Sequence, residues 1–367
     1  MFDRRLLEYF PWGLVGIILL LGLLGFGTLY SAVNAGNPVT ISGLPTKQLI
    51  WFSAGFIIMI VAILFNYKIL ERWAPEIYLF CVLLLLCVLF FGKYGGGSKR
   101  WLWVGPFSIQ PSELTKIAVI IILARLYSKW VNPRGLTIRE LISPIGLMLI
   151  PFICIVKQPD LGTAMLILLI AGSITVFVKI EKRLFLFLLA SLIVLVPLIW
   201  FFLAGYQKQR ILTFLDPNRD PLGAGYHIIQ SKIAIGSGMI SGKGFLKGTQ
   251  NALSFLPEEH TDFIFSVLAE EWGLIGSTVV LILFLILISL GLKTAHECRD
   301  PFGIILAIGI TAMIFWQVII NIGMVMGLIP VVGIPLPFIS YGGSSIVTTM
   351  TCIGLLLNIN MRRFMIE

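Results

Sequence analysis

Residues 12–33 read WGLVGIILLLGLLGFGTLYSAV and contain no charged side chain. Residues 274–292, LIGSTVVLILFLILISLGL, form a second uncharged stretch of this kind. An α-helix needs about 20 consecutive, mostly apolar residues to cross the hydrocarbon core of a bilayer. Over the whole chain 58% of the residues are hydrophobic and 12% are charged, whereas soluble domains carry about 25% charged residues. The composition therefore predicts an integral membrane protein.

Apolar stretches of similar length recur along the chain and are separated by polar segments. This pattern predicts a single polytopic membrane domain, residues 1–367, built as an all-α bundle of about ten transmembrane helices. The stretch 141–156 is short for a spanning helix, so it could be tilted or buried within the bundle. The expected spans are 12–33, 49–66, 76–92, 112–130, 141–156, 161–178, 184–204, 263–292, 302–328 and 342–360.

Basic residues in the connecting segments predict the orientation of the bundle. With both chain ends in the cytoplasm, the cytoplasmic segments hold fifteen Lys and Arg residues and the short outer loops hold five. Lys and Arg concentrate on the cytoplasmic side of membrane proteins, so both termini are expected there. The long connection 205–262, between the seventh and eighth helices, is then extracytoplasmic. Connections of this length usually carry function.

Several function classes are disfavoured. The net charge of +9 does not indicate nucleic-acid binding, because the basic residues form short clusters between apolar stretches. The five cysteines form no C-x-x-C pair, which argues against a zinc site or a disulfide framework. Residues 236–244, GSGMISGKG, do not match the spacing of a phosphate-binding loop. Their glycines are expected to allow tight turns, while Lys243 is a candidate contact for an anionic headgroup.

Ionisable residues near apolar spans are the first candidates for function. Glu113 and Lys116, in QPSELTK at 110–116, are three residues apart and share a helix face. The pair either takes part in function or is an ion pair that only joins helices. In KQPDLGT at 157–163, Asp160 lies just before an apolar span and by itself favours a helix cap.

The densest polar cluster is EEHTD at 258–262, where the chain re-enters the membrane. Thr261 or Asp262 could cap the following helix, but a cap does not require five consecutive polar residues. Glu270 and Glu271 follow in the same predicted helix, about 12 Å deeper at 1.5 Å per residue. At that depth two acids are expected to face the bundle interior, a cavity or a cation.

Acidic and basic groups therefore gather at the outer membrane face beside a long loop. This arrangement suits an amphipathic, anionic substrate such as a lipid with a phosphorylated headgroup. A metal site built from His227 or His260 and nearby carboxylates matches no zinc spacing. The residues alone do not separate an enzyme from a transporter of such a lipid.

Six strings, in order, resemble the SEDS family (shape, elongation, division and sporulation) of membrane proteins. They are RWL at 100–102, QPSE at 110–113, QPDLGT at 158–163, DPLGAGYHIIQSKIAIGSG at 220–238, LPEEHTDFIF at 256–265 and PVVGIPLPFISYGGSS at 330–345. The resemblance covers nearly the whole chain, and Met239 departs from it where many relatives have Gly. GKGFLKGTQN at 242–251, VVGIPLP at 331–337 and the short N-terminal tail are more similar to the elongation branch than to the division branch.

The resemblance implies a peptidoglycan glycosyltransferase that polymerises lipid II during cell elongation and supports rod shape. It implies a class B penicillin-binding protein that crosslinks the strands as partner, together with other elongation-complex proteins and membrane lipid, in the bacterial cytoplasmic (inner) membrane. The catalytic acid of the family corresponds to Asp262, and its intramembrane pair corresponds to Glu113 and Lys116. The remaining candidates for binding substrate and its diphosphate are Lys99, Arg100, Arg210, Lys243, His260 and Glu258.

The implied reaction agrees with a single essential base. The acceptor hydroxyl must lose a proton as it attacks the anomeric carbon of the donor, and Asp262 could accept that proton. Cationic groups would stabilise the departing diphosphate. An α-linked donor and a β-linked product imply inversion, and a diphosphate hardly needs the general acid that inverting glycosidases use. Mg²⁺ or another divalent cation is a candidate cofactor.

Three alternative functions remain open. A lipid II flippase would need a hydrophilic path through the membrane midplane, and Glu270 and Glu271 are the residues that favour it. A division paralogue of the same family would share the chemistry. A scaffold that only recruits the crosslinking enzyme explains the bundle but not the polar cluster at 258–262.

Overall fold

The computed structural model describes residues 10–35, 43–95, 98–104, 107–130, 135–220, 223–253 and 260–363. Within these ranges ten helices have 17 residues or more, and each coincides with an expected span. Seven of them are long and apolar enough to cross a membrane, so the predicted multi-pass bundle is confirmed. The ten are α2 (Trp12–Asn34), α3 (Leu44–Leu64), α5 (Ala74–Phe91), α6 (Pro111–Ser128), α7 (Ile138–Val156), α8 (Leu161–Phe177), α9 (Lys182–Phe202), α13 (Ile264–Glu297), α14 (Pro301–Val325) and α15 (Gly343–Arg362).

Helix α7 corrects the expectation of a short fifth span. It begins three residues earlier than expected and has 19 residues. Thr137 and Glu140 form a capping box at its start, which satisfies backbone N–H groups that have no partner within the helix. Ile142 and Ile153 are exposed on its outer surface. The helix is therefore long enough to cross the bilayer and is not buried within the bundle.

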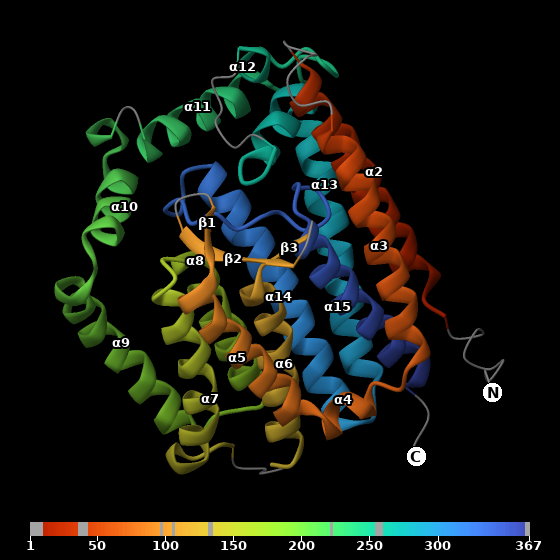
Figure 1. Ribbon diagram of the computed structural model, residues 1–367, viewed down its shortest axis with the longest axis vertical. Coiled ribbons are helices and arrows are strands. Elements are labelled where there is room, and N and C mark those ends of the chain that lie inside the picture. The colour runs from red at the N-terminus through yellow and green to blue at the C-terminus, as the bar shows by residue number, and fades with distance from the viewer. Residues whose placement is uncertain are drawn as a thin grey trace.

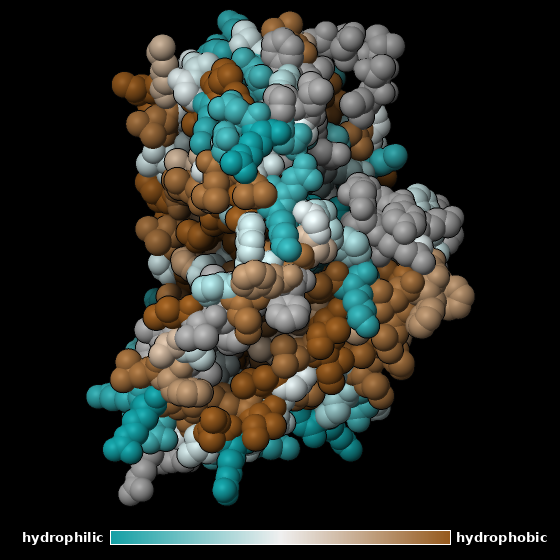
Figure 2. All heavy atoms as spheres, turned by 90° about the vertical axis from the view of Figure 1, so that its left-hand side faces the viewer, coloured by the Kyte–Doolittle hydropathy of each residue, from teal (hydrophilic) through white to brown (hydrophobic). Residues whose placement is uncertain are grey.

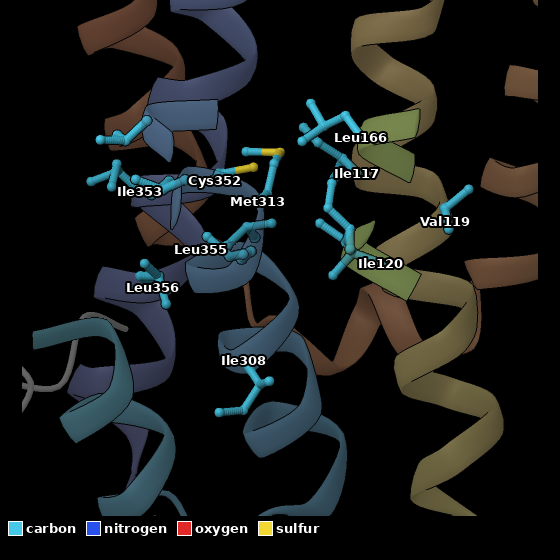
Figure 3. Packing of buried hydrophobic residues seen from close by; sticks show 14 of the residues in the cluster. Ile117, Val119, Ile120, Leu166, Ile308, Met313, Cys352, Ile353, Leu355 and Leu356 are labelled. Carbon is cyan, nitrogen blue, oxygen red and sulfur yellow. The ribbon is translucent and has the colours of Figure 1, made fainter. Parts of the chain in front are cut away.

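Helices α14 and α15 form the centre of the bundle. Of the 18 most apolar consecutive residues in each helix, 72% are buried in α14 and 78% in α15, against 33% or less in the other five apolar spans. Ile117 and Ile120 of α6 and Leu166 of α8 point toward Met313 of α14, and Cys352 of α15 lies beside Met313 (Figure 3). The outer helices present apolar side chains outward, as expected for surfaces in contact with lipid.

The bundle has two distinct ends. We call the end where α2 begins and α15 finishes the terminal end, and the opposite end, where α11 (Ala224–Ser237) and α12 (Thr249–Ala252) lie, the loop end (Figure 1). Hydrophilic residues gather near both ends of the long axis, and a broad hydrophobic region lies between them (Figure 2). This distribution matches a molecule that spans a bilayer between two aqueous phases.

The loop end contains structure that the sequence did not predict. Three short antiparallel strands, in the order β1-β2-β3, connect α5 to α6 (Figure 1). The long connection between α9 and α13 contains four further helical segments, of which α10 packs mainly on η1 and α11. The strands are β1 (Lys93–Gly95), β2 (Ser98–Val104) and β3 (Phe107–Ile109), and the short helices are α4 (Lys68–Arg72), α10 (Gly205–Leu215), η1 (Pro217–Arg219), α11 (Ala224–Ser237) and α12 (Thr249–Ala252).

Helix α13 has two limbs that meet at Gly273, whose φ of 64° and ψ of −159° are not helical. In the short limb, 264–271, Ser266 contacts Ser231, which in turn donates to the carbonyl of Val325, the last residue of α14. This limb therefore runs toward the loop end. The long limb, 274–297, returns to the terminal end, where Glu297 pairs with Arg363 at 2.6 Å.

Residues 239–244 replace the backbone hydrogen bonds that the break in α13 removes. In a continuous helix the amides of residues 274 and 275 would donate to the carbonyls of residues 270 and 271. Here those four groups bond to the segment 239–244, which we call the strap. The bonds are Leu274 N to Met239 O (2.9 Å), Ile275 N to Ile240 O (3.2 Å), Lys243 N to Glu270 O (3.0 Å) and Gly244 N to Glu271 O (3.0 Å).

The strap can approach α13 this closely because Gly242 has no side chain. A Cβ atom at this position would overlap the carbonyl oxygen of Glu271, and the φ of +75° disfavours other residues as well. The sequence reading of the glycines in 236–244 as turn residues is thus confirmed at Gly242. Their further role in contacting α13 was not predicted.

Candidate active site

The connection between α14 and α15, residues 326–342, is the central element of the loop end. Gly327, Gly333 and Phe338 have positive φ values of 67°, 73° and 64°, which fold the connection tightly back on itself. One side of it contacts the segment 260–262 through backbone and side-chain hydrogen bonds. Another side packs on the start of α8, where Gly162 lies against the carbonyl of Val332.

Asp262 lies on a non-helical turn just before α13. Its backbone carbonyl accepts a hydrogen bond from Asn321 Nδ2 at 3.0 Å, and its side chain is partly exposed. A Cβ atom on Gly333 would be 3.1 Å from Asp262 Oδ2, so the carboxylate lies directly over this glycine. The N-cap of α13 is Phe263, which makes no side-chain cap bond. Asp262 thus lies one residue before the N-cap of α13.

Aromatic rings surround the segment that bears Asp262. His227 of α11 stacks on Phe263, with ring centroids 5.7 Å apart and planes 18° from parallel. His260 and Tyr341 have centroids 6.2 Å apart. Burial raises the pKa of the Tyr341 hydroxyl above its usual value, so this group stays protonated as a hydrogen-bond donor at neutral pH.

Asp160 combines the predicted cap with an electrostatic contact. Its Oδ1 accepts the amide of Thr163 at 3.2 Å, which caps α8. Its Oδ2 accepts Gln110 Nε2 at 3.3 Å and lies 3.8 Å from Arg100 Nη1. The Arg100 side chain is 23% exposed, so this cation is available at the surface of the loop end.

Glu113 and Lys116 form an ion pair of 2.8 Å in the first two turns of α6. Their side chains are 5% and 1% exposed. Glu113 also lines a cavity of about 320 Å³ between α3, α6 and α15, together with Trp51, Ser344 and Thr348. Glu113 Oε2 and Thr348 Oγ1 are buried and have no hydrogen-bond partner among the described residues. The pair therefore keeps hydrogen-bonding capacity beside a cavity.

The same connection joins the Glu113 region to the Asp262 region. Ser344, at the start of α15, accepts the amide of Gln110, which lies directly before α6. Tyr341, three residues earlier, donates its amide to the carbonyl of His260 at 3.0 Å. The fold thus brings Asp262, Asp160 with Arg100, and Glu113 with Lys116 around one connection at the loop end.

The other predicted site residues are placed differently. Lys243 of the strap bonds Glu270 at 2.6 Å and Thr249 Oγ1 at 2.7 Å. Arg210 lies on α10, with its guanidinium 6.0 Å from the centre of the Tyr206 ring. Lys99 lies in β2, and Glu258 lies outside the described residues. Among the described residues, no group of three or more His, Cys, Asp or Glu side chains is placed to hold a metal ion.

The comparisons with known proteins agree with this architecture. Residues 11–364 match the sequence profile of the FtsW/RodA/SpoVE family, described as cell cycle proteins. The chain belongs to the FtsW/RodA/SpoVE family. It is 42% identical over 353 residues to the peptidoglycan glycosyltransferase MrdB of Escherichia coli (strain K12), covering 96% of this chain and 94% of that protein.

Solved structures of FtsW/RodA/SpoVE relatives have the same fold. A chain of a peptidoglycan synthase complex, studied for its coordination of polymerization and crosslinking, superposes with a TM-score of 0.83 at 30% identity, over 97% of this chain and 98% of that one. The rod shape-determining protein RodA of Thermus thermophilus gives a TM-score of 0.73 at 28% identity, with the same coverage.

For this FtsW/RodA/SpoVE member the structure corrects the position of Glu270 and Glu271. Neither lies deeper in the membrane than Asp262, because the short limb of α13 runs toward the loop end. Glu271 accepts a hydrogen bond from Ser31, close to the end of α2 at Asn34. Both side chains are buried under the strap. The sequence estimate failed because it assumed that α13 is straight.

Sequence reasoning also missed Asn321 and Ser340. Asn321 is fully buried near the end of α14, and Ser340 is 3% exposed. Both bond the backbone of the segment that carries Asp262. Ser340 lies inside the string PVVGIPLPFISYGGSS, but a hydroxyl there gives no indication of its partner. For Asn321 the sequence did offer a signal, because it is a polar amide within a mostly apolar span.

Proposed function

We propose that this protein is a peptidoglycan glycosyltransferase that polymerises lipid II into glycan strands for cell-wall elongation. The observation that supports this most directly is the placement of Asp262. Its partly exposed carboxylate lies over Gly333 at the loop end, on a turn fixed to its surroundings by hydrogen bonds. The sequence strings at 242–251 and 331–337 favour elongation over division.

In the proposed reaction Asp262 acts as the general base. The hydroxyl of the acceptor sugar transfers its proton to the Asp262 carboxylate while its oxygen attacks the anomeric carbon of the donor. The bond from that carbon to the undecaprenyl diphosphate breaks, and the diphosphate leaves with the electron pair. Attack opposite the leaving group inverts the α-linkage to a β-linkage. Arg100 and Lys116 are the proposed cations that stabilise the leaving charge.

A divalent cation remains a candidate cofactor. Because the described residues offer no group of three or more metal-binding side chains, Mg²⁺ would have to be held mainly by the diphosphate of the substrate. Mg²⁺ is commonly bound in this way, through one or two carboxylates and substrate phosphates. The proposed steps above require only residues of this chain.

The proposed setting is the bacterial cytoplasmic membrane, with both termini in the cytoplasm and the loop end outside. The distribution of Lys and Arg supports this orientation. The proposed partner is a class B penicillin-binding protein, which would crosslink the strands that this chain makes, alongside other elongation proteins. The similarity to a chain of a peptidoglycan synthase complex supports a partner of this kind.

The flippase alternative has lost its main support. It relied on Glu270 and Glu271 lying along a hydrophilic path through the midplane. Both acids instead lie under the strap, where Lys243 and backbone amides of the long connection bond Glu270. The polymerase is therefore the function that the arrangement of polar groups supports best.

The decisive experiment incubates the purified protein with labelled lipid II in detergent, where no leaflets exist. Glycan chains would support the polymerase. Transfer of lipid II between the leaflets of a vesicle, without polymer in either assay, would support the flippase and contradict the proposal.

Asp262→Asn tests the base directly. Asn has nearly the same shape as Asp and caps a helix about as well, so this variant should keep its thermal stability and its binding of the partner. An amide cannot accept the proton, so chain formation should fall by about two to four orders of magnitude. Asp216→Asn, at an exposed acid of the same connection, is the control and should retain activity. An Asp262→Asn protein that polymerises within a fewfold of the parent would show that the base is elsewhere.

A further inference from the structure

Three consecutive backbone carbonyls before α13 are each held by a different residue. The donors come from α14 and from the connection 326–342, which are far from this segment in the sequence. The bonds are Tyr341 N to His260 O at 3.0 Å, Ser340 Oγ to Thr261 O at 2.7 Å and Asn321 Nδ2 to Asp262 O at 3.0 Å. We call these three bonds the clamp.

The clamp bonds carbonyls of residues that precede the first helical residue of α13. Residues 260–263 form a turn, and α13 begins only at Ile264. A buried carbonyl without a partner costs about 1–3 kcal/mol. Each donor of the clamp therefore favours one arrangement of the turn over the alternatives. Because the segment lies outside helices and strands, these donors help to fix its conformation.

The two side-chain donors also connect Asp262 to the loop beneath its carboxylate. Asn321 Nδ2 donates to the carbonyl of Ile334 at 2.7 Å as well as to that of Asp262. Ile334 follows Gly333, over which the carboxylate lies. Ser340 Oγ accepts the amide of Leu336 at 2.8 Å while it donates to Thr261. Both residues thus fix the Asp262 turn relative to residues 333–336.

We propose that Asn321 and Ser340 are positioning residues that orient the Asp262 carboxylate toward the acceptor hydroxyl. This inference rests on the proposed function, in which Asp262 is the base. A misplacement of about 1 Å in an active site can cost about a hundredfold in rate. Loss of one clamp bond lets the turn move relative to Gly333, so the rate of proton transfer falls while the surfaces that bind lipid II stay in place.

The main test compares Asn321→Leu with Asn358→Leu. Asn358 is an equally buried amide of α15 that donates to the backbone carbonyls of Ala62, Ile63 and Phe65 at the terminal end. Both variants remove an amide that serves more than one backbone carbonyl, so a general effect on folding appears in both. We expect kcat for lipid II polymerisation to fall about tenfold to a hundredfold only in Asn321→Leu, with KM changed less than about threefold.

Ser340 provides a second variant that changes less volume. Ser340→Ala removes the hydroxyl, whereas Ser340→Thr keeps it. The inference predicts a lower kcat in Ser340→Ala and recovery in Ser340→Thr. Amide hydrogen exchange at residues 260–264 should rise in Ser340→Ala and Asn321→Leu and stay at the parent level in Asn358→Leu. Unchanged exchange and unchanged kcat in both clamp variants would overturn the inference.

A double-mutant cycle separates failure of the clamp from failure of the base. If Asn321 acts through Asp262, then Asn321→Leu should not lower the residual rate of Asp262→Asn any further. If Asn321→Leu lowers the polymerisation rate by the same factor in the parent and in Asp262→Asn, Asn321 acts elsewhere. This result would overturn the clamp while leaving the role of Asp262 as the base intact. Full activity of Asp262→Asn by itself would instead refute the base and, with it, the positioning role.

Discussion

Two Lys–Glu pairs with a buried carboxylate are similar in distance but differ in their surroundings. Glu113 and Lys116 are 2.8 Å apart on one helix, and Lys116 is the only hydrogen-bond donor to the Glu113 carboxylate among the described residues. Glu270 and Lys243 are 2.6 Å apart and join α13 to the long connection. Glu270 Oε1 accepts five bonds, from Lys243 Nζ, the amides of Thr249 and Gln250, and the hydroxyls of Thr249 and Ser237.

The difference separates a structural pair from a candidate functional one. Donors from the long connection hold Glu270 Oε1, and this contact fixes the strap to α13. The other carboxylate oxygen is buried without a partner in both Glu270 and Glu113, but Glu113 also lines a cavity of about 320 Å³. A charged pair or an unpartnered oxygen alone therefore does not indicate function, whereas the adjacent cavity gives Glu113 room to bind a substrate.

The largest effect on stability is expected at the pair of Lys243 and Glu270. Lys243→Met leaves the fully buried Glu270 carboxylate without its cation, which should destabilise the protein by about 3–5 kcal/mol. Thermal unfolding in detergent measures this loss. The double variant Lys243→Met/Glu270→Gln removes both charges and should recover most of it. A Lys243→Met protein as stable as the parent but inactive would mean that Lys243 binds substrate instead.

The next largest effect is expected at the pair of Glu113 and Lys116, and it is an effect on activity. Lys116→Met should lower lipid II polymerisation by about two to three orders of magnitude, because a cation near the leaving diphosphate is lost. Glu113→Gln/Lys116→Met removes the isolated buried charge and should restore stability but not activity. If this double variant polymerises at the rate of the parent, the pair is structural and the contrast with Lys243 and Glu270 disappears.

The smallest effect is expected in the strap, which Lys243 and Glu270 fix to α13. Gly242→Ala places a methyl group against the carbonyl of Glu271 and imposes a disfavoured φ of +75°. It should cost about 1–3 kcal/mol in unfolding free energy. Gly236→Ala is the matched control, since nothing lies within 4 Å of its added Cβ atom, within α11. Equal melting temperatures for the two variants would show that the strap tolerates a wider approach.

The sequence predicted the ten long helices because each apolar stretch reports directly on burial in lipid. It did not predict the β1-β2-β3 sheet, since strands of three to seven residues leave no clear periodicity. It also did not predict the fold-back of α13. The sequence EEWGLIG at 270–276 leads directly into the apolar helical pattern of 274–292, and the break at Gly273 is compensated by the strap, residues 239–244, earlier in the chain.

The candidate site, like the fold, could be predicted only in part from the sequence. The strings singled out Asp262, Glu113 and Lys116, and the fold gathers all three regions around residues 326–342. The partners of these residues depend on contacts over long sequence distances, which one sequence does not reveal. Asn321 reaches Asp262 across 59 positions and Ser340 reaches Thr261 across 79. The catalytic role of Asp262 and the binding roles of the other candidates stay predictions until the variants are measured.

The fold-back of α13 has a consequence for how the chain is made. As a straight helix α13 would be about 51 Å long at 1.5 Å per residue, well beyond the roughly 30 Å of a bilayer core. The strap precedes α13 in the order of synthesis, so the backbone groups that the break at Gly273 leaves open have their partners already present in the chain when residues 264–275 are made. The order of the segments along the chain thus allows the bent helix to form with these polar groups bonded.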